Sequence, residues 1–420
     1  MPPGHDPTPS QIHRAHVATS IVFVLNGWTF ATWAGRIPDL KATLHLSPGQ
    51  LGLLLLVGSA GSLVGLPSAG RLATRYGAAR TVLGGAILTQ LALAAVAISA
   101  EHRHDPMVTA APLFITMLGL GLWDVAMNIE GAAVEHRLNR TVMPRYHAGF
   151  SLGTVLAAAL ASVMTATHIP LTWHFGLGAP IVMALATAAV SAFLPHSHTS
   201  PPDAQHTPTV DGPTPRRHAT AWQEPRTLMI GAVTLIAAFT EGAANDWLSI
   251  TLIDGHGLPS GAGVLGFAFF LTCMTAGRWY GADLLDRYGR VPLLRVFFLV
   301  AATGSLLVVT GTPWLAALGA GLWGIGVSLG FPVGMSAAAD DPHHAAARVS
   351  VVSTIAYGAF LIGPPALGHL GDLVGMRHAL LVVPVLLTAA LAITPVLQEQ
   401  RGSRRYDDPP ADQGRADQGR

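Results

Sequence analysis

The sequence has little charge. Charged residues make up 11% of its 420 residues, against about 25% in soluble domains. Hydrophobic residues make up 50%, and the mean hydropathy is +0.46. Water cannot be the solvent for most of such a surface, so the composition indicates a polytopic membrane protein. The net charge of +1 comes without a continuous basic face, which argues against nucleic-acid binding.

Cysteine is almost absent. The one cysteine, Cys273, lies in an apolar run, which excludes an intramolecular disulfide and a cysteine-based metal cluster. The 19 histidines show neither the helical i, i+4 pairing nor the spacing of a preformed metal site. We therefore expect no metal and no cofactor. The G-x-x-x-x-G-K-[ST] loop that would cradle nucleotide phosphates is also missing, which argues against an ATP-driven pump.

Long apolar runs are abundant. Crossing the hydrocarbon core of a bilayer takes about 20 apolar residues in a helix, and only helices and closed barrels satisfy every backbone group there. The sequence has twelve such runs, which predict an all-α protein with twelve transmembrane helices. We expect them at residues 17–37, 49–70, 80–100, 107–131, 144–166, 171–194, 227–252, 260–283, 291–311, 313–337, 346–368 and 377–397.

One polar stretch divides the chain in two. Residues 195–226 are rich in proline and threonine and cannot bury a core, so we expect a linker between two six-helix halves. The polar tail ends in the tandem repeat ADQGRADQGR, which is typical of disorder. We expect five parts: a short segment before the first helix at 1–16, the first six-helix half at 17–194, the linker at 195–226, the second six-helix half at 227–397 and the tail at 398–420.

The two halves carry related motifs. The turn GRLATRYGAAR at Gly70–Arg80 returns as GADLLDRYGR at Gly281–Arg290. Two further pairs occur in topologically equivalent helices: GLGLW at 119–123 with GAGLW at 319–323, and Asn26-Gly27 with Glu241-Gly242. Self-similarity in register over half the chain indicates a duplicated six-helix unit.

Basic residues are distributed unevenly among the loops. If both chain ends lie in the cytoplasm, all but four of the 24 lysines and arginines lie on that side, the exceptions being Arg36, Lys41, Arg103 and Arg377. Cytoplasmic loops retain Lys and Arg. We therefore expect both termini and the linker to be cytoplasmic, in a multi-pass protein of the cytoplasmic membrane.

The first of the repeated turns supports a family resemblance. The chain resembles the major facilitator superfamily, whose loop between helices 2 and 3 reads roughly G-x-x-x-D-R-x-G-R-R. Further stretches are similar to its YbjJ-like bacterial branch, namely Asn26-Gly27 through Arg36-Ile-Pro38, 124–128, His147-Ala148 and Glu241-Gly242 through Asp246-Trp247. The resemblance covers residues 17–397 and implies a transporter that works by alternating access. The residues that match the loop in the first half are Gly70, Arg75, Gly77 and Arg80.

The two turns differ at the acidic position. Thr74 replaces the usual acid in the first turn, whereas the second retains Asp286 followed by Arg287. We expect both turns to control conformational change, and the second to matter more because its acid can form charge-assisted contacts. The residues assigned to this role are Gly70, Arg75, Gly77, Arg80, Asp286, Arg287, Gly289 and Arg290.

Few acids lie in the middle of the apolar runs. A charge at the bilayer centre costs about 2.5 to 3.5 kcal/mol, so such an acid needs a partner, a water-filled cavity or a proton. Glu241 lies near the midplane with no basic residue nearby on its own segment, and Asp124 lies in the inner part of segment 4. We expect both to exchange protons, and we expect Arg278 to pair locally with Asp283 or to reach the interface.

Other polar and aromatic residues are candidates for a substrate cavity between the halves. The alternative for each is a structural role, in which amides bond across helices and tryptophans pack. The candidates are Asn26, Asn128, Asn245, Asp246, Trp28 and Trp123.

These observations predict a secondary transporter of a small organic solute. We expect proton coupling and a polar or weakly basic solute, because the candidate site consists of acids and amides and the fifth helix lacks the Gly-Pro pair of drug antiporters. The expected partners are the solute, protons and the bilayer, and we expect a monomer that is not an enzyme. The alternatives are a sensor with a transporter fold and a membrane-embedded enzyme.

Overall fold

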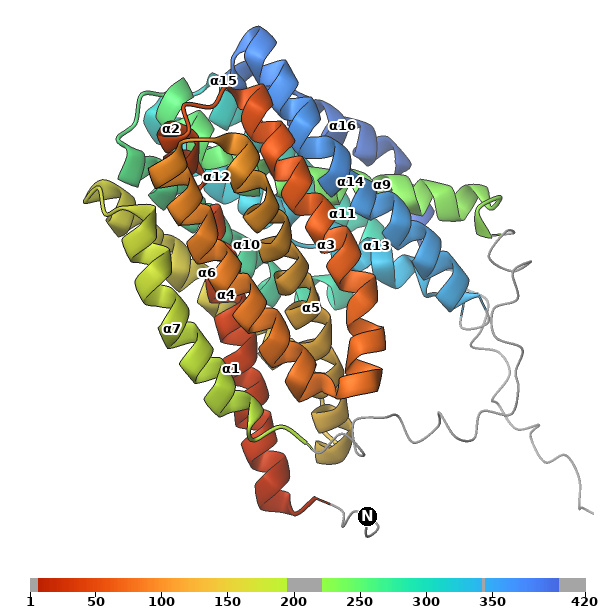
Figure 1. The fold of residues 1–420 in the computed structure, drawn as a ribbon. Helices are drawn as coiled ribbons and strands as arrows, with labels where there is room; N and C mark the ends of the chain where they lie inside the picture. Colours follow the sequence, from red (N-terminus) through yellow and green to blue (C-terminus); the bar gives the residue numbers. More distant parts are fainter. Residues whose placement is uncertain (1–6, 195–220, 342–343, 400–420) are drawn as a thin grey trace, which may run out of the picture.

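The computed structural model describes residues 7–194, 221–341 and 344–399, and all the elements found in them are helical (Figure 1). The first half contains α1 (Pro9–Ala34), α2 (Ile37–Thr43), α3 (Pro48–Tyr76), α4 (Ala78–Arg103), α5 (Pro106–Leu138), α6 (Met143–Ala166) and α7 (Leu171–Val190). The second half contains α9 (Pro225–Ile250), η3 (Thr251–Gly255), α10 (Ser260–Tyr288), α11 (Arg290–Thr310), α12 (Pro313–Val327), α13 (Gly330–Ala338), α14 (Ala345–Val374), α15 (Met376–Ala379), α16 (Val382–Ile393) and η4 (Thr394–Leu397).

Twelve of the described segments are long and apolar enough to span a membrane, which confirms the predicted fold class. The first begins at Pro9, eight residues before the expected start, because Thr8 caps the helix just before Pro9 and forms a capping box with Gln11. The predicted linker lies mostly outside the described residues, and so does most of the tail after residue 398.

The chain starts several spans with the same local signal. A side chain that accepts a backbone hydrogen bond precedes a proline at the first helical position, as in Ser47-Pro48 and Asp105-Pro106. Proline at this position loses no hydrogen bond, and the cap satisfies an amide that would otherwise have no partner. These caps fix where a helix begins even though the apolar run itself has no sharp boundary.

The repeated GxGLW sequence has a packing function in both halves. Gly119 of α5 lies against Gly85 of α4, and Gly319 of α12 lies against Gly304 of α11. A Cβ atom on Gly85 would be 2.8 Å from the carbonyl oxygen of Gly119. The small residues let the helix backbones touch, and the tryptophan that ends each motif is fully buried beside this contact.

The tenth span is not continuous. It is interrupted at Ser328 and Leu329, between α12 and α13, in the glycine-rich stretch that ends with Gly330 and Pro332. Ser328 Oγ donates to the carbonyl oxygen of Ile325 at 2.7 Å, which satisfies one of the acceptors left free by the break. The span can therefore bend at this point.

The halves touch at one face of the bundle. We call the face at which α1 begins the amino-terminal face, and the other the opposite face (Figure 1). The beginning of α3 packs on the end of α14, where a Cβ on Gly52 would be 2.5 Å from the carbonyl oxygen of Pro364. The end of α6 meets the beginning of α10, and Ser162 Oγ donates to the carbonyl oxygen of Gly261 at 2.8 Å. All these contacts lie toward the opposite face.

Candidate functional site

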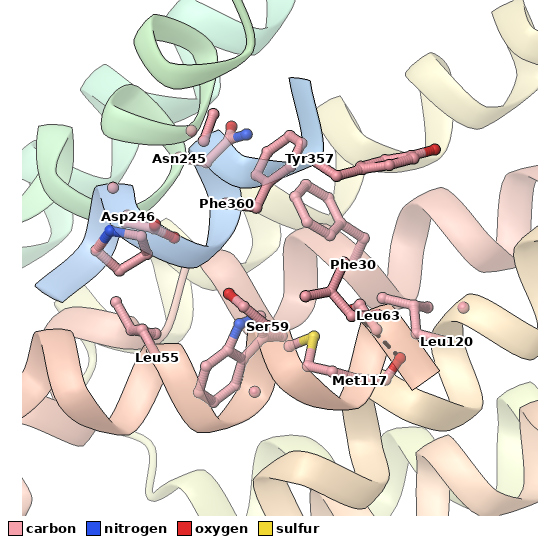
Figure 2. A pocket seen from close by; sticks show the side chains of 18 of the residues that line it. Phe30, Leu55, Ser59, Leu63, Met117, Leu120, Asn245, Asp246, Tyr357 and Phe360 are labelled. Atoms are coloured by element: carbon pink, nitrogen blue, oxygen red, sulfur yellow. Dashed lines mark hydrogen bonds between the residues drawn. The ribbon is translucent and has the colours of Figure 1, made fainter. Parts of the chain in front are cut away.

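A cavity of about 350 Å³ lies between the halves, with walls from α1, α3, α5 and α6 on one side and α9 and α14 on the other. Figure 2 shows Asn245 and Asp246 toward one end, Leu63 and Leu120 toward the other, and the rings of Phe30 and Phe360 between them. Its polar lining residues are Asn26, Ser59, Ser62, Asp124, Asn245, Asp246 and Tyr357. Its aromatic lining residues are Phe30, Trp33, Phe150, Phe239, Trp247, Tyr357 and Phe360.

Each half contributes one carboxylate to this cavity. Asp124 comes from α5 and Asp246 from α9. Within the described residues, neither carboxylate makes a hydrogen bond or an ion pair, and none of the residues that line the cavity is Arg, Lys or His. The cavity therefore offers acceptors and negative charge with no protein cation to balance them.

The two acids lie at different depths. Asp246 is about 14 Å from Gly255, where its span ends at the opposite face, taking a rise of about 1.5 Å per residue. Asp124 is about 21 Å from Leu138, the end of α5 at the amino-terminal face. Asp246 thus lies near the closed end of the cavity, and Asp124 lies farther toward the amino-terminal face.

Two of the predicted amides also line the cavity. Asn26 is 2% exposed, and its Nδ2 has no hydrogen-bond partner. The Oδ1 of Asn245, next to Asp246, is likewise buried without a partner. A buried amide without a partner loses the hydrogen bonds it made in water, so these groups favour a polar ligand. Asn128 does not line the cavity, because its Nδ2 donates to the backbone oxygen of Asp124 at 2.8 Å.

The two tryptophans predicted for the cavity lie elsewhere. Trp123 is fully buried in the first-half core beside the Gly85 contact. Trp28 lines a second, almost wholly apolar pocket of about 750 Å³, between α1, α4, α6 and α7. Trp33 and Trp247 take their place in the cavity wall. Neither Trp123 nor Trp28 therefore lines this cavity, although Trp247, which directly follows Asp246, does.

Glu241 has a basic partner, contrary to the sequence prediction. Arg278 Nη2 of α10 donates to Oε1 and Oε2 of Glu241 at 3.0 and 3.2 Å. Arg278 Nε also donates to the carbonyl oxygen of Ser328 at 3.4 Å, at the break between α12 and α13. The expected pairing of Arg278 with Asp283 was therefore wrong. Neither Glu241 nor Arg278 is among the residues that line the cavity, so this ion pair is not part of the cavity wall.

The repeated turns share one backbone conformation. Gly77 has φ 88° and ψ 155°, and Gly289 has φ 78° and ψ 167°, a region that favours glycine. Arg75 and Arg287 each lie over the ring of the following tyrosine. Among the described residues Asp286 makes no hydrogen bond or ion pair.

The last arginine of the second turn does have partners. Arg290 pairs with Asp340 at 2.6 Å and donates to Ser336 at 2.9 Å. This contact connects α11 to α13 within the second half, so the second turn is tied to its own half rather than to the first.

Sequence reasoning missed most of the apolar wall. Phe30, Tyr357 and Phe360 have no signal that distinguishes them from aromatic residues facing lipid or core.

The sequence also contains Gly149-Phe-Ser-Leu-Gly153, which fits the G-x-S-x-G pattern of hydrolases. It lies within α6, with Ser151 8% exposed, and not at the strand-to-helix turn which that nucleophile requires.

Comparisons with known proteins agree with this architecture. The sequence profile of the Major Facilitator Superfamily matches residues 19–310 and 259–417. The chain is 30% identical over 379 residues to an uncharacterized transporter, y4wD, of Sinorhizobium fredii, covering 90% of this chain and 96% of that one. It is 27% identical over 379 residues to the membrane protein MosC of Rhizobium meliloti, covering 87% and 86%.

Two solved structures have a similar fold at low identity. The nucleoside transporter NupG superimposes with a TM-score of 0.70 at 13% identity, covering 91% of this chain and 98% of that one. A bacterial homologue of the human lysosomal transporter Spinster, in an inward-facing and unoccupied conformation, gives 0.71 at 15%, covering 93% and 98%. The matched profile, the relatives and the twelve spans agree: this chain belongs to the major facilitator superfamily, as a multi-pass membrane transporter and not an enzyme.

Proposed function

We propose that the protein is a proton-coupled secondary transporter of a small organic solute in the cytoplasmic membrane. The observation that carries the proposal is the cavity between the halves, because each half contributes a carboxylate without a protein partner. Rocking of the halves about such a site would expose it to each side of the membrane in turn. The acids and amides of the wall suit a polar or weakly basic solute.

The structure supports an inward-facing conformation for this proposal. The contacts between halves described above close the opposite face, where α3 meets α14 and α6 meets α10. The uneven distribution of arginines favours a cytoplasmic amino-terminal face. On that orientation the solute would enter or leave the cavity from the cytoplasm.

Two acids are proposed to carry protons, by different means. Asp124 lines the cavity and can exchange a proton directly with water or with the solute that enters. Glu241 is held by Arg278 between α9 and α10. Protonation of Glu241 would remove its attraction for Arg278 and loosen the link to the break at Ser328, which would couple proton uptake to movement of the tenth span.

The single cysteine makes a direct test of alternating access possible. In a Cys273→Ser background, Ser59→Cys places one thiol on the cavity wall. A transporter should be labelled by a membrane-impermeant maleimide from both faces, in vesicles of opposite orientation. Labelling from one face only would contradict the transport proposal and favour the alternative, a sensor that binds ligand without moving it.

Proton coupling needs a flux measurement. Purified protein is reconstituted into vesicles that contain a pH-sensitive dye, and candidate solutes are added outside, including a nucleoside, a pentose and an amine. We expect at least one solute to move protons, and protein-free vesicles to show none. Solute uptake without any proton movement would contradict coupling but not transport.

The branch of the family is also a proposal. Asn26-Gly27, Asp124 to Asn128 and Glu241-Gly242 support membership of the YbjJ-like branch. Three of these positions line the cavity, namely Asn26, Asp124 and Gly242. The relatives with full-length matches include an uncharacterized transporter of Yersinia pestis, 30% identical over 385 residues.

A further inference from the structure

Several polar groups of the cavity wall have no partner among the described residues, and they include acceptors as well as the donors Asn26 Nδ2 and Trp247 Nε1. Asp246 offers a carboxylate without a partner, and the neighbouring Asn245 offers an Oδ1 without a donor. Asn26 adds a donor without an acceptor, and it is 2% exposed. A ligand that satisfies this set must bring hydrogen-bond donors to Asp246 and an acceptor to Asn26.

The rest of the wall sets the character of the ligand's body. Phe30, Trp33, Trp247 and Phe360 surround the cavity with aromatic rings. Ring faces attract cations as well as apolar groups, most strongly where water is excluded. A carboxylate ligand would be repelled by Asp246 and would find no basic residue among the lining residues, so the electrostatics select against anions.

We propose, resting on the transport function above, that the solute is an organic cation: an amine that also carries a hydroxyl or carbonyl group. Its ammonium group lies between Asp246 and Oδ1 of Asn245, and its oxygen accepts from Nδ2 of Asn26. The amine supplies the donors that the acid and the amide oxygen lack. Asp246 is then the residue that determines charge specificity.

A matched set of three probes tests the charge. Tyramine, tyrosol and 4-hydroxyphenylacetate share a ring and a phenolic oxygen but carry an ammonium, a hydroxyl and a carboxylate. Calorimetric titration of the purified protein should show tyramine binding roughly tenfold or more tighter than the other two, as expected for a charge-assisted hydrogen bond. Asp246→Asn should abolish the difference. The control is Asp105→Asn. Asp105 caps α5 at the opposite face, and asparagine caps a helix equally well.

The outcomes separate this inference from the function on which it rests. Equal or tighter binding of tyrosol or the acid, or no binding of any probe, overturns the cation proposal. A preference for tyramine that survives in Asp246→Asn overturns the role of that residue. The Ser59→Cys labelling assay needs no ligand, so its result decides separately whether the protein is a transporter.

A second inference comes from the last loop of the chain. Gly375, between α14 and α15, has φ 79° and ψ 145°, the conformation found in Gly77 and Gly289. Gly368, Asp372 and Gly375 repeat the spacing of Gly70, Thr74 and Gly77. This third copy of the turn lies at the opposite face, whereas the two copies recognised from sequence lie at the amino-terminal face.

The third turn crosses between the halves. Asp372 Oδ1 accepts from the backbone N–H of Gly49 at 3.1 Å, and Oδ2 accepts from Ser47 Oγ at 3.2 Å. Ser47 caps α3, so the carboxylate lies on the exposed amides at the start of a helix, where the helix dipole attracts an anion. Gly368 packs against the same helix start, and a Cβ there would be 2.5 Å from the carbonyl oxygen of Pro48.

One further ion pair joins the halves beside this contact. Lys41 Nζ, in the last turn of α2, lies 2.8 Å from Oδ2 of Asp254 in η3. The Asp254 side chain is 48% exposed, so the pair contributes little. Asp372 is exposed as well, but its carboxylate makes two hydrogen bonds to the start of α3 beside the close packing of Gly368 on Pro48, so this contact carries the larger share of the closure.

We infer that Asp372 is a latch that holds the opposite face closed, as part of the alternating access proposed above. Asp372→Asn keeps the size of the side chain but removes the charge that the amides of α3 attract. The equilibrium should shift toward the state in which the cavity opens to the opposite face. The substitution should therefore change the populations of the two conformations and leave the cavity wall as it is.

The Ser59→Cys reporter measures this shift in both directions. In Asp372→Asn, labelling from the opposite face should rise roughly fivefold and labelling from the amino-terminal face should fall. Asp105→Asn, which changes an acid at the same face within one half, should leave both rates unchanged. Ser47→Ala, which removes only the hydroxyl donor, should shift both rates in the same directions but less.

Partial unfolding would give a different result. It would raise labelling from both faces together, because the thiol would become accessible by either route. Unchanged rates in Asp372→Asn, or a parallel rise from both faces, would overturn the latch.

Discussion

At the scale of single residues, the polar groups of the membrane spans divide into paired and unpaired acids. Both carboxylate oxygens of Glu241 accept from Nη2 of Arg278, whereas Asp124 and Asp246 have no partner among the described residues. Neutralising Glu241 leaves Arg278, whose side chain is 35% exposed, without its counter-charge. The paired acid and the unpaired acids should therefore respond differently to neutralisation.

Glu241→Gln tests the paired acid. We expect solute binding and exchange to survive and pH-driven accumulation to be lost, because glutamine keeps a hydrogen bond to Arg278 but cannot take up and release a proton. Accumulation is measured in vesicles with and without an imposed pH gradient. Equal accumulation by the variant and the parent protein would make Glu241 structural and leave Asp124→Asn as the next variant in the same assay.

Single residues also show how far sequence reasoning reaches. Asp124, Asn26, Asn245 and Asp246 could be predicted, because a polar group in an apolar run has few places to lie. The partner of Glu241 could not be predicted from its own helix, since Arg278 is contributed by α10. Aromatic residues such as Phe30 are compatible with lipid, core or cavity, and only the packing of helices decides among them.

At the scale of helices, adjacent glycines on α4 provide a matched comparison. A Cβ on Gly85 would be 2.8 Å from Gly119 O and from Trp123 N, while one on Gly84 meets nothing within 4 Å. Alanine is otherwise the better helix residue. We expect Gly85→Ala to destabilise the protein by about 1 to 3 kcal/mol and Gly84→Ala to leave the melting temperature in detergent unchanged or higher. Equal effects would mean that the α4 and α5 backbones are not in close contact.

The two turns at the amino-terminal face give a further prediction. Asp286 has no partner in this conformation among the described residues, so its contacts are available to the state in which the amino-terminal face closes. Thr74 bonds only to the carbonyl oxygen of Gly70 within its own helix. Asp286→Asn should therefore reduce transport more than Thr74→Ala, compared at equal amounts of protein in the membrane. An equal or reversed order would refute the asymmetry between the turns.

At the scale of the whole molecule, the number of spans and the duplication follow from sequence, whereas the conformation does not. Helix length and apolar composition determine the twelve spans. Which face is closed depends on contacts such as Gly52 with Pro364, between residues far apart in the chain. The third turn does not stand out in the sequence, because the Arg-Tyr-Gly core of the other two turns is replaced there by Leu-Val-Gly, which ends at Gly375.

The orientation of the whole molecule is the last prediction. With both chain ends in the cytoplasm, the sequence predicts that all but four of the 24 basic residues lie on that side, and moving each across the membrane during insertion would be unfavourable. The exceptions Arg36, Lys41 and Arg377 have carboxylate or backbone partners at the opposite face, which stabilise them there. Reporter enzymes fused after Pro195 and after Gln398 should both show cytoplasmic activity. A fusion after Arg103 is the control and should show external activity. External activity at either of the first two positions would reverse the orientation, and the closed face would then face the cytoplasm.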